Sequence, residues 1–198
     1  MSVAFEHVSF RYGDRPVLQD VSFTLPNRGV VCLFGESGCG KTTVLRLLCG
    51  LERPQSGRIT GLDGRTAAVF QEDRLLPWAS VLENVRLPLS GPDASARAAD
   101  WVDRVGLREV AQAFPQSLSG GMQRRVALAR ALATPADRLL LDEPFTGLDA
   151  GWTERLCTQI REAYRDRLVV LVTHQPGEAA ALGAQVWHLS GPPLSGNL

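Results

Sequence analysis

The sequence predicts an α/β fold, in which a mixed sheet flanked by helices forms a core that a helical segment interrupts. Three observations lead to this prediction. Uninterrupted apolar runs at 30–34 and 168–172 are typical of strands buried on both faces of a sheet. Helical spacing of apolar residues directly follows the first run, which indicates that strands and helices alternate. The stretch of about 72–133, by contrast, carries helix signals and little strand pattern.

The first part of the chain predicts a small antiparallel β part, then a buried strand and a helix. Segments 3–10 and 17–25 flank turn residues around Gly13 and are expected to form a hairpin. The buried strand at 30–34 leads through a glycine-rich turn into a helix at 41–49, whose apolar residues have helical spacing. Two short strands are expected at 58–60 and 67–70.

The middle of the chain predicts three helices. Ser80 and Glu83 have the spacing of a capping box, which marks a helix start. Segment 94–105 is rich in alanine and amphipathic, and Ser119 can cap a third helix that runs through Ala133. These features predict an inserted α-helical subdomain.

Strands and helices alternate again in the last part of the chain. Strands are expected at 138–141 and 168–172, with a helix at 152–164 between them. Pro176 fits the first turn of a further helix, and 185–189 is expected to be the last strand. We therefore expect a single domain over 1–198, with a core at 1–71 and 134–190, a helical insertion at about 72–133, and a loose Pro/Gly/Ser-rich tail at 191–198.

Composition narrows the possible functions. The 198 residues are 44% apolar, which is ordinary for a folded protein, and 21 basic side chains balance 21 acidic ones. A net charge of zero gives no support for binding nucleic acid, so no nucleic-acid partner is expected. The apolar runs are too short to span a bilayer, and the N-terminal residues lack a secretory signal pattern. The four cysteines form no C-x-x-C pair, which favours reduced thiols and a cytoplasmic location.

A phosphate-binding loop is the strongest single motif. Residues 35–42 read Gly-Glu-Ser-Gly-Cys-Gly-Lys-Thr, which satisfies G-x-x-x-x-G-K-[ST] between a predicted strand and a predicted helix. Backbone amides of such a loop cradle phosphate oxygens. Lys41 is expected to contact the β and γ phosphates, and Thr42 to offer a hydroxyl ligand to Mg²⁺. By itself this motif leaves a small-molecule kinase, a GTPase and a motor as alternatives.

Two later motifs narrow the choice. Residues 139–143 form a predicted buried strand that ends in two carboxylates, of which Asp142 is placed to hold Mg²⁺ through water and Glu143 to act as general base on the attacking water. Ser119, followed by two glycines at a helix start, predicts a second anion site. One chain has no need of two γ-phosphate sites, whereas two copies arranged head to tail do need them.

With these motifs in this order, the chain resembles the ATP-binding cassette (ABC) family, and the resemblance extends to about residue 189. It implies a RecA-like P-loop NTPase core, ATP and Mg²⁺ as ligands, and ATP hydrolysis. The implied catalytic residues are Glu143, His174 as the switch histidine and Gln71 in the Q-loop, and the implied metal-site residues are Thr42, Gln71 and Asp142. The implied ATP-binding residues are Tyr12, which would stack on adenine, together with Gly35, Glu36, Ser37, Gly38, Cys39, Gly40, Lys41, Thr42 and Thr43. The signature residues Ser119, Gly120, Gly121 and Gln123 would act on the ATP of a partner chain, and Asp149 lies in the D-loop.

The resemblance also implies partners and a place in the cell. An ABC transporter subunit pairs with a second copy of itself and with membrane permease subunits, on the inner face of the cell membrane. The segment from Val69 to Trp78, followed by 81–85, looks like bacterial importers of the nitrate/sulfonate/taurine type, which would add an extracytoplasmic substrate-binding protein. A soluble ABC ATPase of translation or DNA repair and a small-molecule kinase are the rival hypotheses.

Several residues allow more than one interpretation. Trp78 either packs inside the insertion or anchors a permease helix, and His174 is either structural or a γ-phosphate contact. Cys39 is either a small residue tolerated in the loop or a reactive thiol. Arg124, Arg125 and Arg130 are expected to be solvated rather than functional, with a position near phosphate as the alternative for Arg124 or Arg125.

Overall fold

A parallel β-sheet forms the centre of the molecule. The structure is a computed structural model that describes residues 2–197. The sheet has five strands in the order β5-β6-β7-β3-β8, and every neighbouring pair is parallel. All residues of β6 and β7 are buried, which explains why the sequence of these strands is continuously apolar. The strands are β3 (Gly29–Gly35), β5 (Thr66–Val69), β6 (Arg138–Asp142), β7 (Leu168–Val172) and β8 (Gln185–Leu189).

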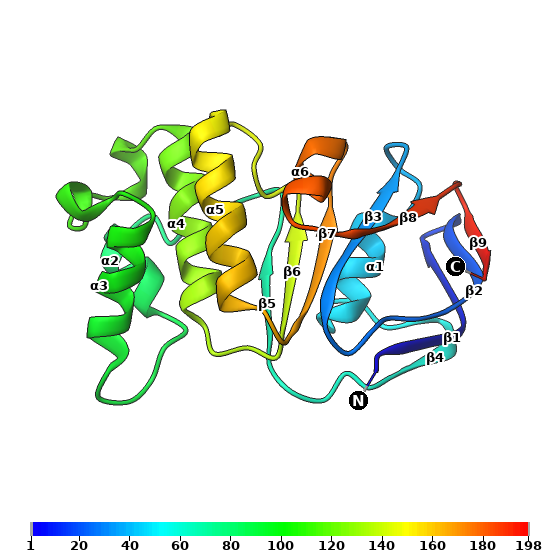
Figure 1. Cartoon of the computed structure of the whole chain (residues 1–198). Helices are drawn as coiled ribbons and strands as arrows, with labels where there is room; N and C mark the ends of the chain where they lie inside the picture. The colour runs from blue at the N-terminus through cyan, green and yellow to red at the C-terminus, as the bar shows by residue number, and fades with distance from the viewer. Residues whose placement is uncertain (1, 198) are drawn as a thin grey trace.

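A smaller sheet lies at one end of the molecule (Figure 1). Its order is β4-β1-β2-β9, with β1 antiparallel to β2 and to β4, and β9 parallel to β2. The expected mixture of strand directions therefore occurs here and not in the central sheet. The strands are β1 (Ala4–Tyr12), β2 (Arg15–Thr24), β4 (Ser56–Thr60) and β9 (Leu194–Asn197).

The prediction of a loose tail at 191–198 is wrong for its described residues 194–197. Strand β9 pairs with β2 from Leu18 to Ser22, and the Leu194 side chain is only 1% exposed. Two effects outweigh the Pro/Gly/Ser-rich composition of the segment. Pairing satisfies backbone groups along the outer edge of β2, and Leu194 joins an apolar cluster beneath that strand.

The two faces of the central sheet are covered differently. Alternate strand residues point to opposite faces, so that Cys32 belongs to one core cluster while Val31 and Leu33 belong to the other. Helix α1 (Lys41–Leu48) and the smaller sheet cover the face of Val31 and Leu33. Helices α4 (Gly120–Ala133), α5 (Ala150–Ala163) and α6 (Pro176–Ala181) contribute buried residues to the other face.

Between β5 and β6 the chain is helical, and this part lies at the opposite end from the smaller sheet (Figure 1). Besides α4 it contains α2 (Val81–Arg86), α3 (Ala94–Arg104) and the short 3₁₀ turns η1 (Arg108–Val110) and η2 (Pro115–Ser117). The capping box is confirmed, because the backbone N–H of Glu83 donates to Ser80 Oγ at 3.2 Å and the N–H of Ser80 donates to Glu83 Oε2 at 2.7 Å. Within residues 2–197, no helix has the length and apolar character needed to cross a membrane.

Candidate functional site

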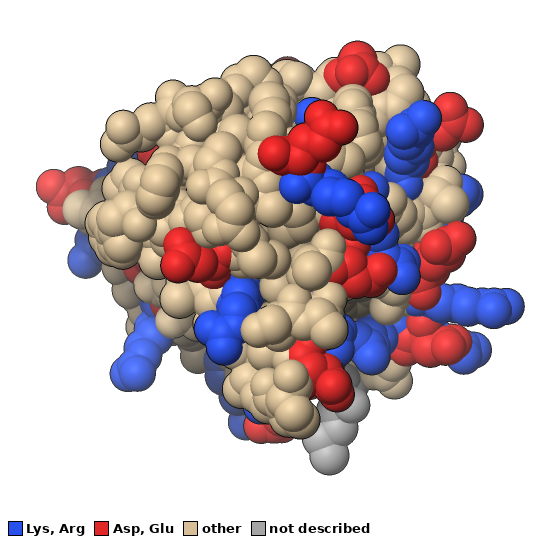
Figure 2. All heavy atoms as spheres, turned by 90° about the vertical axis from the view of Figure 1, so that its left-hand side faces the viewer, with Lys and Arg blue, Asp and Glu red and all other residues tan. Residues whose placement is uncertain are grey.

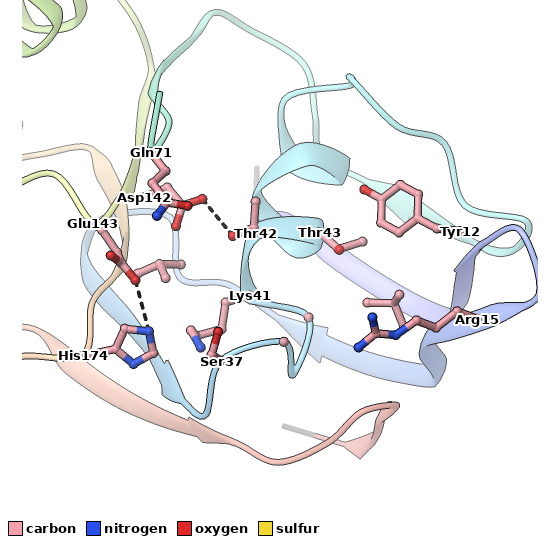
Figure 3. A pocket seen from close by; sticks show the side chains of 14 residues that line it. Tyr12, Arg15, Ser37, Lys41, Thr42, Thr43, Gln71, Asp142, Glu143 and His174 are labelled. Carbon is pink, nitrogen blue, oxygen red and sulfur yellow. Dashed lines mark hydrogen bonds and ion pairs between the residues drawn. The ribbon is translucent and has the colours of Figure 1, made fainter. Parts of the chain in front are cut away.

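A cavity of about 340 Å³ lies at the carboxyl ends of β3 and β6, within the range of small-molecule sites. The carboxyl ends of parallel strands are the usual place for a ligand in an open α/β sheet. Both sheets, the loop before α1 and the segment after β5 contribute to its wall (Figure 3). The lining residues are Tyr12, Arg15, Val17, Ser37, Gly38, Gly40, Lys41, Thr42, Thr43, Gln71, Asp142, Glu143, Val172 and His174.

The loop that joins β3 to α1 depends on glycine at three of its positions. Gly38 and Gly40 have φ 82° and 111°, in the left-handed region that side chains disfavour, and Gly40 directly precedes the first turn of α1. Gly35 lies so close to β8 that a Cβ would approach the carbonyl oxygen of Leu189 to 2.3 Å. The three glycines therefore set the shape of the loop, and Gly38 and Gly40 also line the cavity.

Lys41 places a buried positive charge beneath this loop. Its ammonium donates to the carbonyl oxygens of Gly35 at 2.8 Å and Glu36 at 2.6 Å, and lies 3.7 Å from Cys39 Sγ. An ammonium has three donors, and the one directed at the Cys39 sulfur makes the weakest of these three contacts, so it is the donor most readily given to an anion in the cavity. Ser37 lies close to Lys41 at the cavity wall (Figure 3).

Thr42 and Asp142 place two oxygen ligands side by side, because Thr42 Oγ1 donates to Asp142 Oδ2 at 2.8 Å. Burial raises the pKa of the Asp142 carboxyl above its ordinary value, and the hydrogen bond from Thr42 opposes that shift. A hydroxyl and a carboxylate are the kind of oxygen donor that Mg²⁺ prefers. No group of three His, Cys, Asp or Glu residues that could hold a metal ion occurs in the described chain. A cation at this pair would need phosphate and water oxygens to complete its coordination.

Glu143 and His174 are in contact on the other side of Asp142, with Glu143 Oε1 3.0 Å from His174 Nε2 (Figure 3). Glu143 has φ 47°, a left-handed conformation that costs a residue with a side chain roughly 1–3 kcal/mol. Its backbone N–H donates to the carbonyl oxygen of Val172 at 2.9 Å, which ties the turn after β6 to the end of β7. The fold thus holds this carboxylate in a strained turn that faces the cavity.

The turn that carries His174 depends on a buried carboxylate in α6. Thr173 Oγ1 donates to Glu178 Oε2 and accepts the backbone N–H of Gln175 at 3.1 Å, so both neighbours of His174 are held. Burial raises the pKa of Glu178 above its ordinary value of 4.5, and the negative charge of Glu143 adds to this shift.

Tyr12 lies at the far end of the cavity from Glu143 (Figure 3). Arg46 Nη1 donates to the Tyr12 hydroxyl at 3.1 Å, and the Tyr12 ring packs edge-on against Phe10. The ring is therefore fixed in place while the residue stays 41% exposed at the rim of the cavity.

Most of the predicted ATP-site residues converge on this cavity, and three do not. Gly35 and Glu36 line a separate hollow beside β8, and Cys39 is completely buried, which argues against the accessible reactive thiol. Gln71 reaches the cavity from the segment after β5.

The signature residues lie away from this cavity. Ser119 caps α4, since its Oγ accepts the backbone N–H of Met122 at 3.3 Å. The side-chain amide of Gln123 donates to the carbonyl oxygens of Pro115 and Leu118, so it supports the preceding turn. Asp149 caps α5 through the N–H of Trp152 at 2.9 Å. None of Ser119, Gly120, Gly121, Gln123 and Asp149 lines the cavity of its own chain.

Sequence reasoning missed two arginines. Arg15 lines the cavity next to Tyr12, with its Nη2 3.9 Å from where a Cβ on Gly38 would lie. Its position three residues after Tyr12 was the available signal. Arg124 was expected to be solvated or to lie near phosphate, yet it is 3% exposed and its guanidinium contacts the backbone of the turn of Glu143. No sequence signal separates it from the neighbouring Arg125, because both follow the same helix start.

The chain has clear relatives among known proteins. Residues 18–146 match the family described as ABC transporter. The aliphatic sulfonates import ATP-binding protein SsuB 1 of Mesorhizobium japonicum is 45% identical over 92% of this chain and 73% of that protein. The taurine import ATP-binding protein TauB of Rhizobium johnstonii is 44% identical over 92% of this chain and 76% of that protein.

A solved structure has the same fold. It is the dimeric post-hydrolysis state of the ATP-binding cassette MJ0796 bound to ADP and Pi, with a TM-score of 0.83 and 28% identity over 94% of this chain and 93% of that one. The predicted P-loop NTPase fold is thereby confirmed. Taken with the family match and the two import proteins, this similarity shows that the chain belongs to the ABC transporter family, as an ATPase of the ATP-binding cassette type.

Proposed function

We propose that this chain is the ATP-hydrolysing subunit of an importer for small sulfonates or taurine, and that it works as a dimer on the inner face of the cell membrane. The observation that carries the proposal is the cavity in which Lys41, the Thr42–Asp142 pair and the Glu143–His174 pair converge. Phosphoryl transfer to water needs three groups in this order, namely an ammonium on the phosphates, a cation site and a carboxylate base.

ATP lies along the cavity in this proposal, with adenine at Tyr12 and the triphosphate over the loop before α1. The exposed Tyr12 ring offers a face for stacking, and Arg15 lies beside the loop at the same end of the cavity as this ring (Figure 3). Backbone amides near Ser37, Gly38 and Gly40 face the phosphates, together with the Lys41 ammonium and the Thr43 hydroxyl. Mg²⁺, held by Thr42 and Asp142 with Gln71 nearby, would neutralise charge on the β and γ phosphates.

Hydrolysis requires a base that takes a proton from water. Glu143 supplies this base, because its carboxylate faces the cavity beside the buried Asp142. His174, 3.0 Å from Glu143 Oε1, orients the carboxylate and can donate to the γ phosphate. The strained backbone of Glu143 supports this assignment, since such strain persists where the surrounding structure fixes it.

The dimer supplies the residues that the cavity of one chain lacks. Ser119 begins α4 with two glycines after it, which gives an N-terminus suited to an anion. This N-terminus lies outside the ATP cavity of its own chain. We therefore assign to it the γ phosphate of the ATP that a second copy of the chain binds. The dimeric state of the similar cassette MJ0796 supports this assembly. Gly120, Gly121, Gln123 and Asp149 would lie in the same interface.

The helical part supplies the surface for the permease. Trp78 is 74% exposed, which argues against the interpretation that it packs inside the insertion. It lines a groove of about 350 Å³ with Leu76, Leu87 and Leu89, and two charged residues, Glu83 and Arg86, border it. The face that carries the insertion also has a broad area free of charged side chains (Figure 2). A short permease helix in this groove fits these features.

The relatives suggest the cargo, since one is named for aliphatic sulfonates and another for taurine. An extracytoplasmic binding protein would deliver such an anion to the permease. A strain without this chain should lose uptake of labelled taurine or an alkanesulfonate and keep uptake of nitrate. Loss of nitrate uptake alone would assign the other cargo of this importer type.

The central test measures hydrolysis and assembly together. The purified chain should hydrolyse MgATP without any acceptor, and Lys41→Ala should lower ATP affinity by about 10- to 150-fold, which corresponds to about 1.5–3 kcal/mol for a charge-assisted contact. Glu143→Gln should bind ATP but not hydrolyse it, and should run as a stable dimer in gel filtration with MgATP. Hydrolysis at the wild-type rate in either variant would refute the site, and a monomeric Glu143→Gln protein at saturating ATP would refute the shared interface.

A further inference from the structure

The Arg124 guanidinium lies at the junction of three functional segments. It projects from α4, five residues after Ser119, and only 3% of the residue is exposed. Toward the turn after β6, Nη2 donates to the carbonyl oxygens of Asp142 at 2.9 Å and Glu143 at 2.6 Å, and Nε donates to that of Pro144 at 2.9 Å. Three consecutive carbonyls therefore converge on one side chain.

The same guanidinium also holds the segment that carries Gln71. Its Nη1 donates to the carbonyl oxygen of Phe70 at 2.6 Å and to Asp73 Oδ1 at 2.8 Å, and lies 3.5 Å from the carbonyl oxygen of Gln71. Arg130 on the same helix adds a hydrogen bond to the carbonyl oxygen of Asp73 at 2.7 Å. Helix α4 thus holds the backbone of this segment through hydrogen bonds, so a shift of the helix would also shift the segment.

These contacts require a guanidinium. Its donors lie in one plane and point along fixed directions, so a single group can bridge carbonyls on two sides. A lysine ammonium in the same place offers three donors and no fork, so it cannot keep both sides at once. The hydrogen bond from Arg124 also matters for the carbonyl oxygen of Glu143. The left-handed backbone of Glu143 turns this oxygen toward α4, where it cannot pair with a neighbouring strand.

We propose that Arg124 is a positioning residue that locks the Glu143 turn and the Gln71 segment to the helix that begins at Ser119. The proposal rests on the function proposed above, in which Ser119 contacts the ATP of a second chain. When that contact forms, the N-terminus of α4 is fixed in place. Through its hydrogen bonds, Arg124 then couples the position of α4 to the position of Glu143 in the same chain. Each chain then hydrolyses its own ATP efficiently only while it engages its partner's.

The test compares Arg124→Lys with Arg138→Lys. Arg138 is a matched control because it is also buried, and its Nη2 also donates to the backbone carbonyls of Gly61 and Asp63, but at the opposite end of β6 from the cavity. Arg124→Lys should lower kcat by about 10- to 100-fold, the effect of a small misplacement of a catalytic group, while the affinity of the single chain for a fluorescent ATP analogue stays within about threefold. Arg138→Lys should lose thermal stability and keep kcat within about twofold.

Three results would overturn the proposal. A folded Arg124→Lys protein with wild-type kcat would show that the base needs no such lock. An equal fall of kcat in both variants, in step with their melting temperatures, would reduce Arg124 to a general structural role. Loss of analogue affinity in proportion to kcat would place Arg124 in nucleotide binding instead.

A second variant decides the matter if Arg124→Lys does not fold. Asp73 lies in a loop with its side chain 21% exposed, and Asp73→Asn removes only the ion pair on the side of Gln71. This variant should lower kcat by about three- to tenfold with unchanged analogue affinity, and an unchanged kcat would refute the lock. Wild type and Lys41→Ala are measured beside it. If these two hydrolyse ATP equally, the proposed function itself fails, which is a different result from a failure of Arg124 alone.

Discussion

Replacement of Trp78 by alanine separates a docking role from a role in the core. A free tryptophan side chain offers about 250 Å² of surface, and Trp78 keeps 74% of its surface exposed. The covered quarter, about 60 Å², contributes about 1.5 kcal/mol to folding at ~25 cal/mol per Å². Trp78→Ala should therefore lower the melting temperature by only about 3–6 °C in a chain of this length.

The exposed part of Trp78 sets the expected effect on docking. About 190 Å² remains to be buried against a partner, which allows an upper limit of about 4–5 kcal/mol. Aromatic anchors at interfaces contribute about 2–4 kcal/mol when truncated, and this corresponds to about 30- to 1000-fold weaker association. ATP affinity and hydrolysis by the isolated subunit should not change, because Trp78 lies outside the ATP cavity.

The assay measures how much subunit remains on membranes that carry the permease and have been washed free of the native subunit. Leu51→Ala is the control, since Leu51 is 58% exposed and follows α1, away from the groove. Trp78→Ala should lose membrane retention and transport, and Leu51→Ala should keep both. Wild-type retention of Trp78→Ala would refute docking through this groove, and a melting temperature lower by 15 °C or more (roughly 4 kcal/mol) would restore the core interpretation.

Three further predictions concern the site itself. Mixing inactive Lys41→Ala and Ser119→Arg chains should restore only about 1–10% of wild-type activity, because the mixed dimer has one site without either lesion but the chain that holds this site cannot engage its partner's ATP; no recovery above the separate proteins, with dimers present by gel filtration, would contradict the composite site. Arg15→Gln should raise the KM for ATP about two- to fivefold, as expected for an exposed charge contact, with the effect smaller at high salt, and the exposed Arg11→Gln should not. Glu178→Gln should stabilise the free chain, with a larger rise in melting temperature at about pH 8 than at about pH 4. Burial raises the pKa of Glu178 in the folded chain above 4.5, so the wild type loses stability as the pH rises from 4.5 through this raised pKa. An equal rise in melting temperature at both pH values would refute burial of the charged carboxylate as the cause.

Local sequence rules predicted the features whose causes are local. The capping box at Ser80, the Ser119 cap and the strand–loop–helix of the phosphate site need only near neighbours, and each lies where the sequence places it. Burial of Arg124 could not be predicted in this way, because all but one of its partners are backbone carbonyl oxygens, which lie from 18 to 54 positions away. Every residue has a carbonyl, so no side-chain pattern marks these acceptors.

The same distinction explains the error at the C-terminal segment. Composition alone favours a loose tail at 191–198, since proline and glycine disfavour regular structure. What decides the matter is the free edge of β2, which lies about 175 positions earlier in the chain and offers both hydrogen-bonding groups and an apolar surface for Leu194. Such long-range pairing carries no local signature.

Strand β9 has a consequence for the order in which the protein matures on the ribosome. Leu194 lies beneath the start of α1, where its Cβ would be 3.7 Å from a Cβ on Gly40, and β9 completes the edge of the strand that carries Arg15 and Val17. The phosphate loop precedes β9 in the chain and so emerges from the ribosome before this support does. During elongation the nascent chain therefore displays its nucleotide loop before β9, which backs that loop, has emerged.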